Sequence, residues 1–320
     1  MRAYAIRRIL LGIPTLIIVT ILVFLAVRLI PGNVIELMVA EMAQESGMGE
    51  ELTVDYLRAQ LGLDEAIHIQ YFKFVGNLFR GDFGQSLWTG RDILPDIISR
   101  YPISIELGLI AIIISLSISW PVGVYSAIRQ DTIIDYAGRT FAIGMLAMPN
   151  FWLATMVVVY PSIWFNWTPP IQYIPFVEDP IGNLGMFIIP GFLMGTGMSG
   201  GSMRFLRTMF LEVLRQDYIR TAWAKGLRER TIILKHALRN ASIPLITSFG
   251  PMVLMLFGGS VIMEQIFCIP GLGRFFIDAL NTRDYPIIQV MNLISAGSFI
   301  VVTICIDLSY AWLDPRITYR

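Results

Sequence analysis

The sequence has little charge. Only 15% of its 320 residues are Asp, Glu, Lys or Arg, whereas 55% are hydrophobic and the mean hydropathy is +0.64. A soluble domain carries roughly 25% charged residues, because its surface must face water. A deficit of this size excludes a disordered chain and a conventional nucleic-acid binder. We therefore expect an all-α polytopic membrane protein.

Cysteine, histidine and lysine are also scarce. The two cysteines form no CxxC motif, and the two histidines stand too far apart for a ligand-spaced pair. None of the three lysines follows a glycine, so the chain lacks the Gly-Lys-Ser/Thr of a Walker A motif. HExxH and GxSxG motifs and paired intramembrane carboxylates are missing as well. We predict neither a catalytic site nor a metal or cofactor of its own.

What the sequence does contain is long runs without charge. A helix that crosses the hydrocarbon core needs about 20 apolar residues, and six runs are long enough. The run from Thr140 to Val177 exceeds one helix, and we expect breaks at Pro161 and at Pro169-Pro170. Glycines within 195–201 are expected to allow close helix packing. The six predicted spans are 9–27, 107–127, 140–160, 180–203, 240–263 and 285–306.

The distribution of charge predicts the orientation. The first apolar run has the length of a span and is followed by Arg28-Leu-Ile-Pro-Gly32 instead of a small-x-small cleavage site, which favours a retained anchor over a signal peptide. Six spans put both termini on one side. If that side is cytoplasmic, 16 of the 24 basic and 6 of the 24 acidic residues lie inside, against 8 basic and 17 acidic outside, with Asp307 inside the last span. The positive-inside rule therefore predicts cytoplasmic termini.

These spans divide the chain into regions. Residues 1–30 contain the first membrane helix, 31–105 form an external insertion, 106–312 form the membrane core, and 313–320 form a cytoplasmic tail. The insertion is too long for a simple connector. Composition leaves two roles open for it, a solvated loop that shields the ends of the spans or a docking surface for an external partner.

Few ionisable residues lie near the spans. Arg28, Glu106, Glu264 and Asp284 fall at predicted outer ends, where solvent contact or snorkelling makes a charge cost little. Asp307 lies about one turn inside the cytoplasmic end of the last span, and we expect it to pair with Arg316 or with the cytoplasmic loop.

The cytoplasmic loop 204–239 is basic and has a helical pattern. Gly226 interrupts this pattern, which predicts a helix, a glycine turn and a short helix before Pro244. A DNA-binding helix-turn-helix, a helix on anionic lipid and a docking element for a cytoplasmic protein all fit a basic helix of this kind. The tether to two spans disfavours DNA. The apolar positions before the glycine are Leu206, Met209, Phe210, Val213 and Leu214, and those after it are Leu227, Thr231, Leu234 and Leu238.

Four stretches in order resemble a known family over essentially the whole chain. They are Tyr4–Arg8 leading to Arg28–Gly32, Leu61–Leu63 with Gly76–Leu87, Arg215–Leu227 with His236–Asn240 and Pro244, and Pro270–Arg274 with Arg283–Pro286 and Leu313–Arg316. The sequence resembles the inner-membrane permease subunits of dipeptide/oligopeptide ABC importers. The resemblance implies the type I importer permease fold, with an external insertion between helices 1 and 2.

The third stretch is similar to the EAA loop of importer permeases. Arg220-Thr221-Ala222 stand where the general motif has Glu-Ala-Ala, and Gly226 matches its glycine. The glutamate is absent and Pro244 falls later than in the general pattern, as in the peptide-permease branch. The resemblance implies that the short helix after Gly226 binds a cleft on a cytoplasmic ATPase. The residues expected to couple are Arg220, Thr221, Ala222, Gly226, Leu227, Arg228, Glu229, Leu234 and His236.

The resemblance also implies a mechanism and partners. The chain would act by alternating access in the inner membrane, with a second homologous permease, two ATPases that hold ATP and Mg²⁺, an external substrate-binding protein and surrounding lipid. Related permeases carry oligosaccharides or nickel chelates, so these substrates stay open beside peptides. A membrane scaffold with a lipid- or regulator-binding loop is the alternative of another class. Adaptable apolar side chains that would line the pathway are Met252, Met255, Phe257 and Met263.

Overall fold

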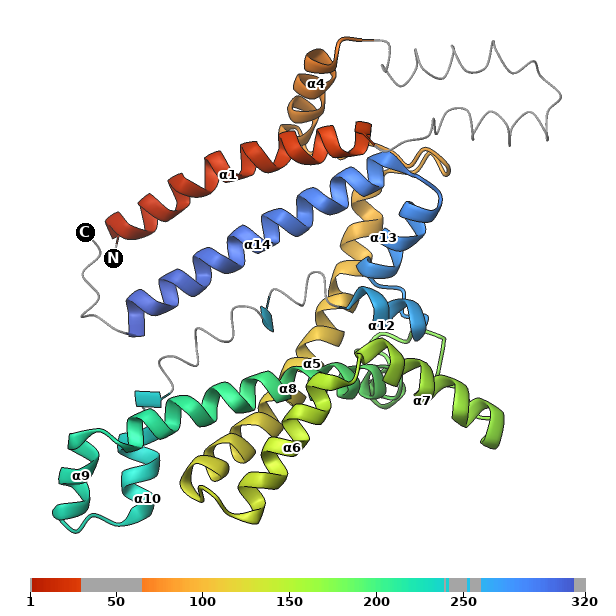
Figure 1. Cartoon of the computed structure of the whole chain (residues 1–320). Helices are drawn as coiled ribbons and strands as arrows, with labels where there is room; N and C mark the ends of the chain where they lie inside the picture. Colours follow the sequence, from red (N-terminus) through yellow and green to blue (C-terminus); the bar gives the residue numbers. More distant parts are fainter. Residues whose placement is uncertain (1, 30–64, 239, 242–251, 254–259, 314–320) are drawn as a thin grey trace. The chain divides into compact units, whose positions relative to one another are not determined.

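The structure is a computed structural model that describes residues 2–29, 65–238, 240–241, 252–253 and 260–313 (Figure 1). By its internal contacts the chain divides into two units. The first comprises Met1–Arg8, Arg100–Arg274 and Ser298–Arg320, and the second comprises Ile9–Ser99 and Phe275–Gly297. Residues 31–64 of the predicted external insertion and most of the predicted fifth span lie outside the described residues.

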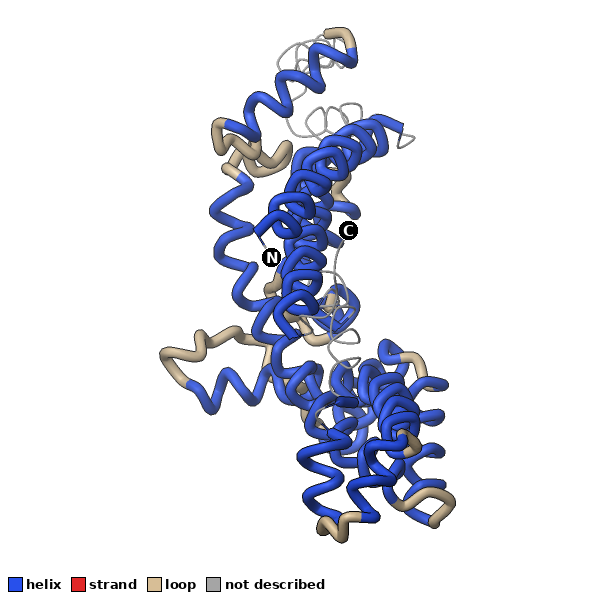
Figure 2. The backbone as a smooth tube through the Cα atoms, turned by 90° about the vertical axis from the view of Figure 1, so that its left-hand side faces the viewer, coloured by secondary structure: helices blue, strands red, loops and turns tan. Residues whose placement is uncertain are grey.

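The described part of the chain consists of helices and loops, as Figure 2 shows, with one isolated antiparallel bridge between Gln85 and Asp92. This confirms the all-α class. The helices are α1 (Arg2–Leu29), α4 (Ile67–Phe79), α5 (Ile93–Ile128), α6 (Ile133–Ala147), α7 (Asn150–Phe165), α8 (Pro180–Leu214), α9 (Asp217–Ala224), α10 (Glu229–Thr231), the π-helix η1 (Ile232–Ala237), α12 (Val261–Ile266), α13 (Leu272–Asn281) and α14 (Tyr285–Leu313).

Three of the described helices, α5, α8 and α14, are long and apolar enough to cross a membrane. The pair α6 and α7 qualifies as a fourth if its two helices form one bent span, and α1 contributes the shorter apolar stretch Leu10–Ala26. Helix α5 begins at Ile93, so its first turns belong to the region predicted as external insertion. The structure thus supports a polytopic helical protein.

The predicted break in the third span is wrong in position. Pro161 lies inside α7, which continues to Phe165, and the chain instead bends by 85° between α6 and α7. Met148 precedes Pro149 and has an extended backbone (φ −90°, ψ 122°). The ring of a proline disfavours the helical conformation of the residue before it, so the helix ends at Ala147. Near the last turn of α7, Pro161 only removes one helical hydrogen bond.

Helix α8 packs closely on its neighbours through glycine. A Cβ atom placed on Gly195 would lie 2.6 Å from the carbonyl oxygen of Ala111 in α5, and one on Gly200 would lie 2.8 Å from that of Ala142 in α6. Figure 1 shows α6 running beside α8, the pair with the most extensive contact among the described helices. The predicted close packing at these glycines is confirmed.

This packing gives a matched pair of substitutions in one helix. We expect Gly195→Ala to lower the thermal midpoint of the detergent-solubilised protein by several degrees, because overpacking costs about 1–3 kcal/mol. A Cβ on Gly201 meets no atom within 4 Å, so Gly201→Ala should be neutral or stabilising by about 0.5–1 kcal/mol. Equal midpoints for the two variants, measured by thermal unfolding, would contradict the packing.

In the second unit, hydrogen bonds join the 85–90 loop to the turn between α13 and α14. The carboxylate of Asp284, which is 2% exposed, accepts hydrogen bonds from Ser86 Oγ at 2.5 Å and from the Leu87 amide at 3.3 Å. Trp88 Nε1 donates to the Thr282 carbonyl at 2.8 Å. The expectation that Asp284 lies in solvent is therefore wrong. It faces hydrogen-bond donors of the 85–90 loop, which compensate for the loss of water.

Candidate functional site

The loop between α8 and the predicted fifth span forms a helical hairpin. Helix α9 leads through Lys225–Arg228 to α10 and η1, and the two arms contact each other at the end of α8 (Figure 1). We call residues 217–237 the coupling hairpin. The predicted helix between Leu206 and Gly226 is wrong in its extent, because the chain breaks at Arg215–Gln216. The stripe Leu206–Leu214 is the end of α8.

Gly226 closes α9 with a Schellman motif. Its φ angle is +72°, in the left-handed region, where a side chain is strained. The Gly226 amide donates to the carbonyl of Trp223 at 2.9 Å, and the Leu227 amide donates to that of Ala222 at 3.3 Å. The predicted glycine turn is confirmed, and its geometry depends on the backbone alone, since no atom surrounds a Cβ at this position.

One face of the hairpin is buried against the membrane helices. Ile219 and Ala222 of α9 and Ile232 and Ala237 of η1 share a core cluster with Phe210 of α8. The cluster continues to Ala127 and Ala241, and Val124 and Ile128 of α5 pack against it. Burial of apolar side chains is worth about 25 cal/mol per Å². The hairpin is therefore fixed on α5 and α8, and displacement of one should move the others.

The opposite face is exposed, apolar and basic. The side chains of Trp223, Leu227 and Leu234 are 49%, 38% and 50% exposed, and Tyr218 is also exposed. Exposed apolar groups gathered on one element mark an interaction site more often than isolated ones do. The exposed basic residues of the hairpin are Arg220, Lys225, Arg228, Arg230 and Lys235.

The predicted coupling residues divide between these faces. Ala222 is buried and Gly226 forms the turn, whereas Leu227 and Leu234 are exposed. The other predicted residues make local contacts. These are Arg220 with Asp217 at 3.4 Å, Thr221 Oγ1 to the Asp217 carbonyl at 2.9 Å, Arg228 before the first turn of α10, Glu229 with Arg129 at 3.9 Å, and the His236 carbonyl accepting from Asn240 Nδ2 at 2.8 Å.

Sequence reasoning missed the aromatic residues of the hairpin. Trp223 follows the buried Ala222 in α9 and is 49% exposed, and Tyr218 Oη accepts a hydrogen bond from Asn240 Nδ2 at 3.0 Å. The signal was present in the sequence, because Ile219 and Ala222 are three apart and define the inward face of a helix. Trp223, 100° further round, had to fall outside that face.

Two of the four residues predicted to line the substrate pathway lie among the described residues. Met252 and Met263 are both buried, and Met263 belongs to the core cluster of Leu107, Met186 and Phe187. Met255 and Phe257 lie outside the described residues. The pathway assignment stays a prediction.

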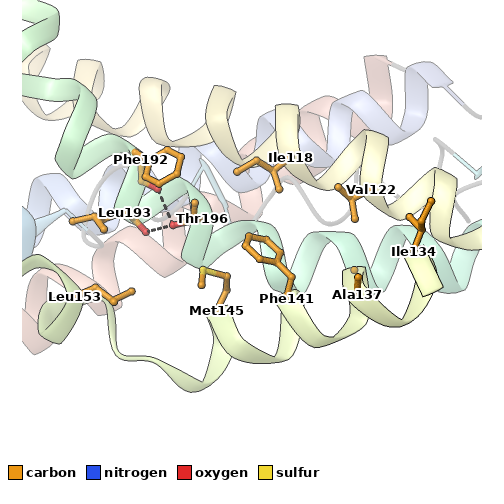
Figure 3. A pocket seen from close by; sticks show the side chains of 11 residues that line it. Ile118, Val122, Ile134, Ala137, Phe141, Met145, Leu153, Phe192, Leu193 and Thr196 are labelled. Atoms are coloured by element: carbon orange, nitrogen blue, oxygen red, sulfur yellow. Dashed lines mark hydrogen bonds between the residues drawn. The ribbon is translucent and has the colours of Figure 1, made fainter. Parts of the chain in front are cut away.

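A separate cavity of about 580 Å³ lies among α5, α6, α7 and α8 (Figure 3). Its walls include Val122, Phe141, Met145 and Phe192, and its one hydroxyl group, that of Thr196, donates within α8 to the carbonyls of Phe192 and Leu193. Neither Met252 nor Met263 lines it. A peptide would lose the hydration of its backbone in this cavity without gaining a free hydrogen-bond partner, which is unfavourable.

The expected solvated environment of Glu264 is wrong, and Asp307 has a partner that was not predicted. Glu264, predicted at a solvated end, is fully buried, and its carboxylate accepts from Ser104 Oγ and Ser260 Oγ at 2.7 Å each and from the Arg274 amide at 3.0 Å. Asp307 pairs with Arg8 Nε at 3.1 Å. Its predicted partner Arg316 lies outside the described residues.

Comparison with known proteins identifies the family. Residues 119–319 match the family described as the binding-protein-dependent transport system inner membrane component, and residues 1–108 match its N-terminal family. The chain belongs to this family. It is therefore a membrane component of a transport system, and the scaffold alternative receives no support.

Relatives cover the whole chain. The oligopeptide transport system permease protein AppB of Bacillus subtilis (strain 168) is 40% identical over 324 residues and 100% of both chains. The glutathione transport system permease protein GsiC of Salmonella typhi is 33% identical over 317 residues and 99% of both. A crystal structure of an amino acid ABC transporter covers 68% of this chain and 94% of its own, with a TM-score of 0.52 and 12% identity. That likeness supports the permease fold.

Proposed function

We propose that this chain is a permease subunit of an ATP-driven importer that moves di- or oligopeptides across the inner membrane. The observation that carries the substrate class is the identity of 40% to an oligopeptide permease over the full length of both chains. A second relative is the permease of a glutathione transport system, and glutathione is a peptide-like solute. Nothing in the chain favours oligosaccharides or nickel chelates.

The coupling hairpin is the proposed binding site for the ATPase subunits. Its inner face is anchored on α5 and α8, and its outer face presents Trp223, Leu227 and Leu234 among basic side chains. Aromatic anchors surrounded by polar groups are typical of protein interfaces. The two ATPase subunits would hold ATP and Mg²⁺, and this chain contributes the residues that receive their movement.

The topology proposed for this role has six spans with both termini in the cytoplasm. A second permease of the same family would complete the pathway, residues 252–263 would contribute to its wall, and an external binding protein would deliver the substrate. For alternating access to work, ATP and the binding protein must each favour one conformation over the other. The excess of basic residues on the hairpin side supports this orientation.

The direct test is uptake by the purified complex in proteoliposomes. We expect accumulation of a labelled oligopeptide that requires ATP, the ATPase subunits and the cognate binding protein. Unlabelled oligopeptide should compete, whereas an oligosaccharide or a nickel chelate should not. Competition by either of these solutes and none by peptide would overturn the substrate class and leave the transport role intact.

A further inference from the structure

A buried ion pair ties the last part of α8 to the first turn of α6. Arg207 donates from Nε to Asp135 Oδ1 and from Nη2 to Asp135 Oδ2, each at 2.8 Å. The Asp135 side chain is fully buried and that of Arg207 is 16% exposed. Bidentate pairs of this kind fix both the distance and the relative angle of the elements that carry them.

The carboxylate is also held from its own side. The Asp131 amide donates to Asp135 Oδ2 at 3.1 Å, and Thr132 caps α6 by accepting from the Asp135 amide at 3.4 Å. Arg139, one turn further along α6, places Nη2 3.4 Å from the same carboxylate. Asp135 therefore presents one defined orientation to Arg207.

Elsewhere the close contacts between α6 and α8 are apolar. A Cβ placed on Gly200 of α8 would lie 2.8 Å from the Ala142 carbonyl oxygen and 3.2 Å from the Leu146 side chain, and one on Gly138 of α6 would lie 3.9 Å from the Met203 side chain of α8. Contacts of this kind permit close approach, but they fix the relative position of two helices less sharply than a bidentate ion pair does. Among the described residues, the hydrogen-bonded contact between the two helices is the one that joins Asp135 to Arg207.

The position of this contact relative to the coupling hairpin suggests its role. Arg207 lies two turns before the end of α8 at Leu214, and the hairpin begins at Asp217. Helix α8 is unbroken from Arg207 to Leu214. In addition, Phe210 of α8 shares a core cluster with the hairpin. A displacement of the hairpin reaches Arg207 through less than two turns of continuous helix.

We propose that Asp135 and Arg207 are positioning residues that pass the movement of the coupling hairpin from α8 to the bent pair α6–α7. The proposal rests on the function proposed above, in which ATPase subunits displace the hairpin. Without the pair, α8 moves relative to α6 instead of carrying it along, and ATP hydrolysis proceeds without the conformational change that carries substrate.

If the ion pair only stabilises the fold, its loss should affect assembly and not the coupling of ATP hydrolysis to transport. A double substitution separates this structural role from the proposed positioning role. Removing one partner would leave an uncompensated buried charge and destabilise the protein strongly, whereas replacing both by apolar residues of similar size is often neutral. Asp135→Leu combined with Arg207→Met therefore removes the directional bond together with both buried charges, while Arg139, whose side chain is 35% exposed, keeps Asp131 and solvent as partners. Arg204→Met is the matched control, because Arg204 is an exposed arginine one turn away on α8.

The readout is the number of peptides transported per ATP hydrolysed, measured on the same proteoliposomes that contain the full complex. We expect the double variant to assemble and to hydrolyse ATP, with this ratio reduced about tenfold, within the range of measured coupling energies. Arg204→Met should leave the ratio unchanged. An unchanged ratio in the double variant, with loss only of assembled complex, would overturn the proposal.

A conservative variant keeps the test decisive if the double variant does not assemble. Arg207→Lys retains the charge but offers an ammonium in place of the planar fork, so it should assemble and still lower the ratio. An unchanged ratio in Arg207→Lys would then overturn the proposal. If instead the wild-type complex lacked ATPase subunits or transported no peptide, the function proposed above would fail, independently of the pair.

Discussion

We expect Gly226→Val to abolish most substrate uptake while the protein still inserts and folds. A β-branched residue at a φ of +72° is strained by about 1–3 kcal/mol, so the Schellman turn opens and α9 loses its angle to η1. No atom lies within 4 Å of the new Cβ, so the strain comes only from the backbone. Uptake should fall about tenfold or more, measured with labelled peptide in proteoliposomes.

The matched control for this substitution is Gly226→Asn. Asparagine tolerates the left-handed conformation better than other non-glycine residues, so it should retain most of the uptake at the same position. Similar losses of uptake in both variants would mean that any side chain introduced at residue 226 disturbs contact with a partner. The turn geometry would then not be the cause, contrary to our expectation.

The largest effect on stability is expected at Glu264. Glu264→Ala removes the acceptor of Ser104 Oγ, Ser260 Oγ and the Arg274 amide, and these donors would lose their partner in a buried site. Each unsatisfied buried donor costs about 1–3 kcal/mol, so we expect a loss of several kcal/mol. The thermal midpoint should fall by about 6–12 °C, and the yield of folded protein should fall with it.

Two further variants locate the cause of this loss. Gln265→Ala changes the exposed neighbour on the same helix and should leave the midpoint unchanged. Glu264→Gln retains one oxygen acceptor and should give an intermediate midpoint. If Glu264→Ala were as stable as Gln265→Ala, the hydrogen bonds of the carboxylate would contribute nothing to folding.

The Gly226 turn and the glycine packing of α8 could be predicted from the sequence because each depends on local chemistry. Only a residue without a side chain adopts the left-handed conformation freely, and only glycine allows two helices to approach as closely as at Gly195. The family could be recognised because four motifs occur in order along the chain. Local rules of this kind need no knowledge of distant contacts.

The buried acids could not be predicted in the same way. Glu264 meets Ser104 across 160 residues of sequence, Asp284 meets Ser86 across 198, and Asp135 meets Arg207 across 72. Hydropathy shows the length of an apolar run, but it does not show which hydrogen-bond donors from distant parts of the chain contact an acid at its end. Each acid was therefore expected in solvent or left without a partner, whereas tertiary contacts supply donors that make burial acceptable.

The position of the bend near Pro149 illustrates a competition between two local rules. Both Pro149 and Pro161 disfavour a helix, and a break was expected only at Pro161 and at Pro169-Pro170, which divide an overlong run. The structure ends the helix at Ala147, where the residue before proline takes an extended backbone, and continues α7 through Pro161. A proline four residues before a helix end is tolerated because few hydrogen bonds depend on it.

The most direct test of the account is a photo-reactive amino acid placed at Trp223 in the assembled complex. We predict that it cross-links to a cytoplasmic ATPase subunit, because Trp223 is half-exposed on the outer face of the coupling hairpin. The same amino acid at Trp167, a similarly exposed tryptophan in the loop after α7, should give no such product. Cross-links from Trp223 to lipid or to the external binding protein, with the ATPases bound, would contradict the account.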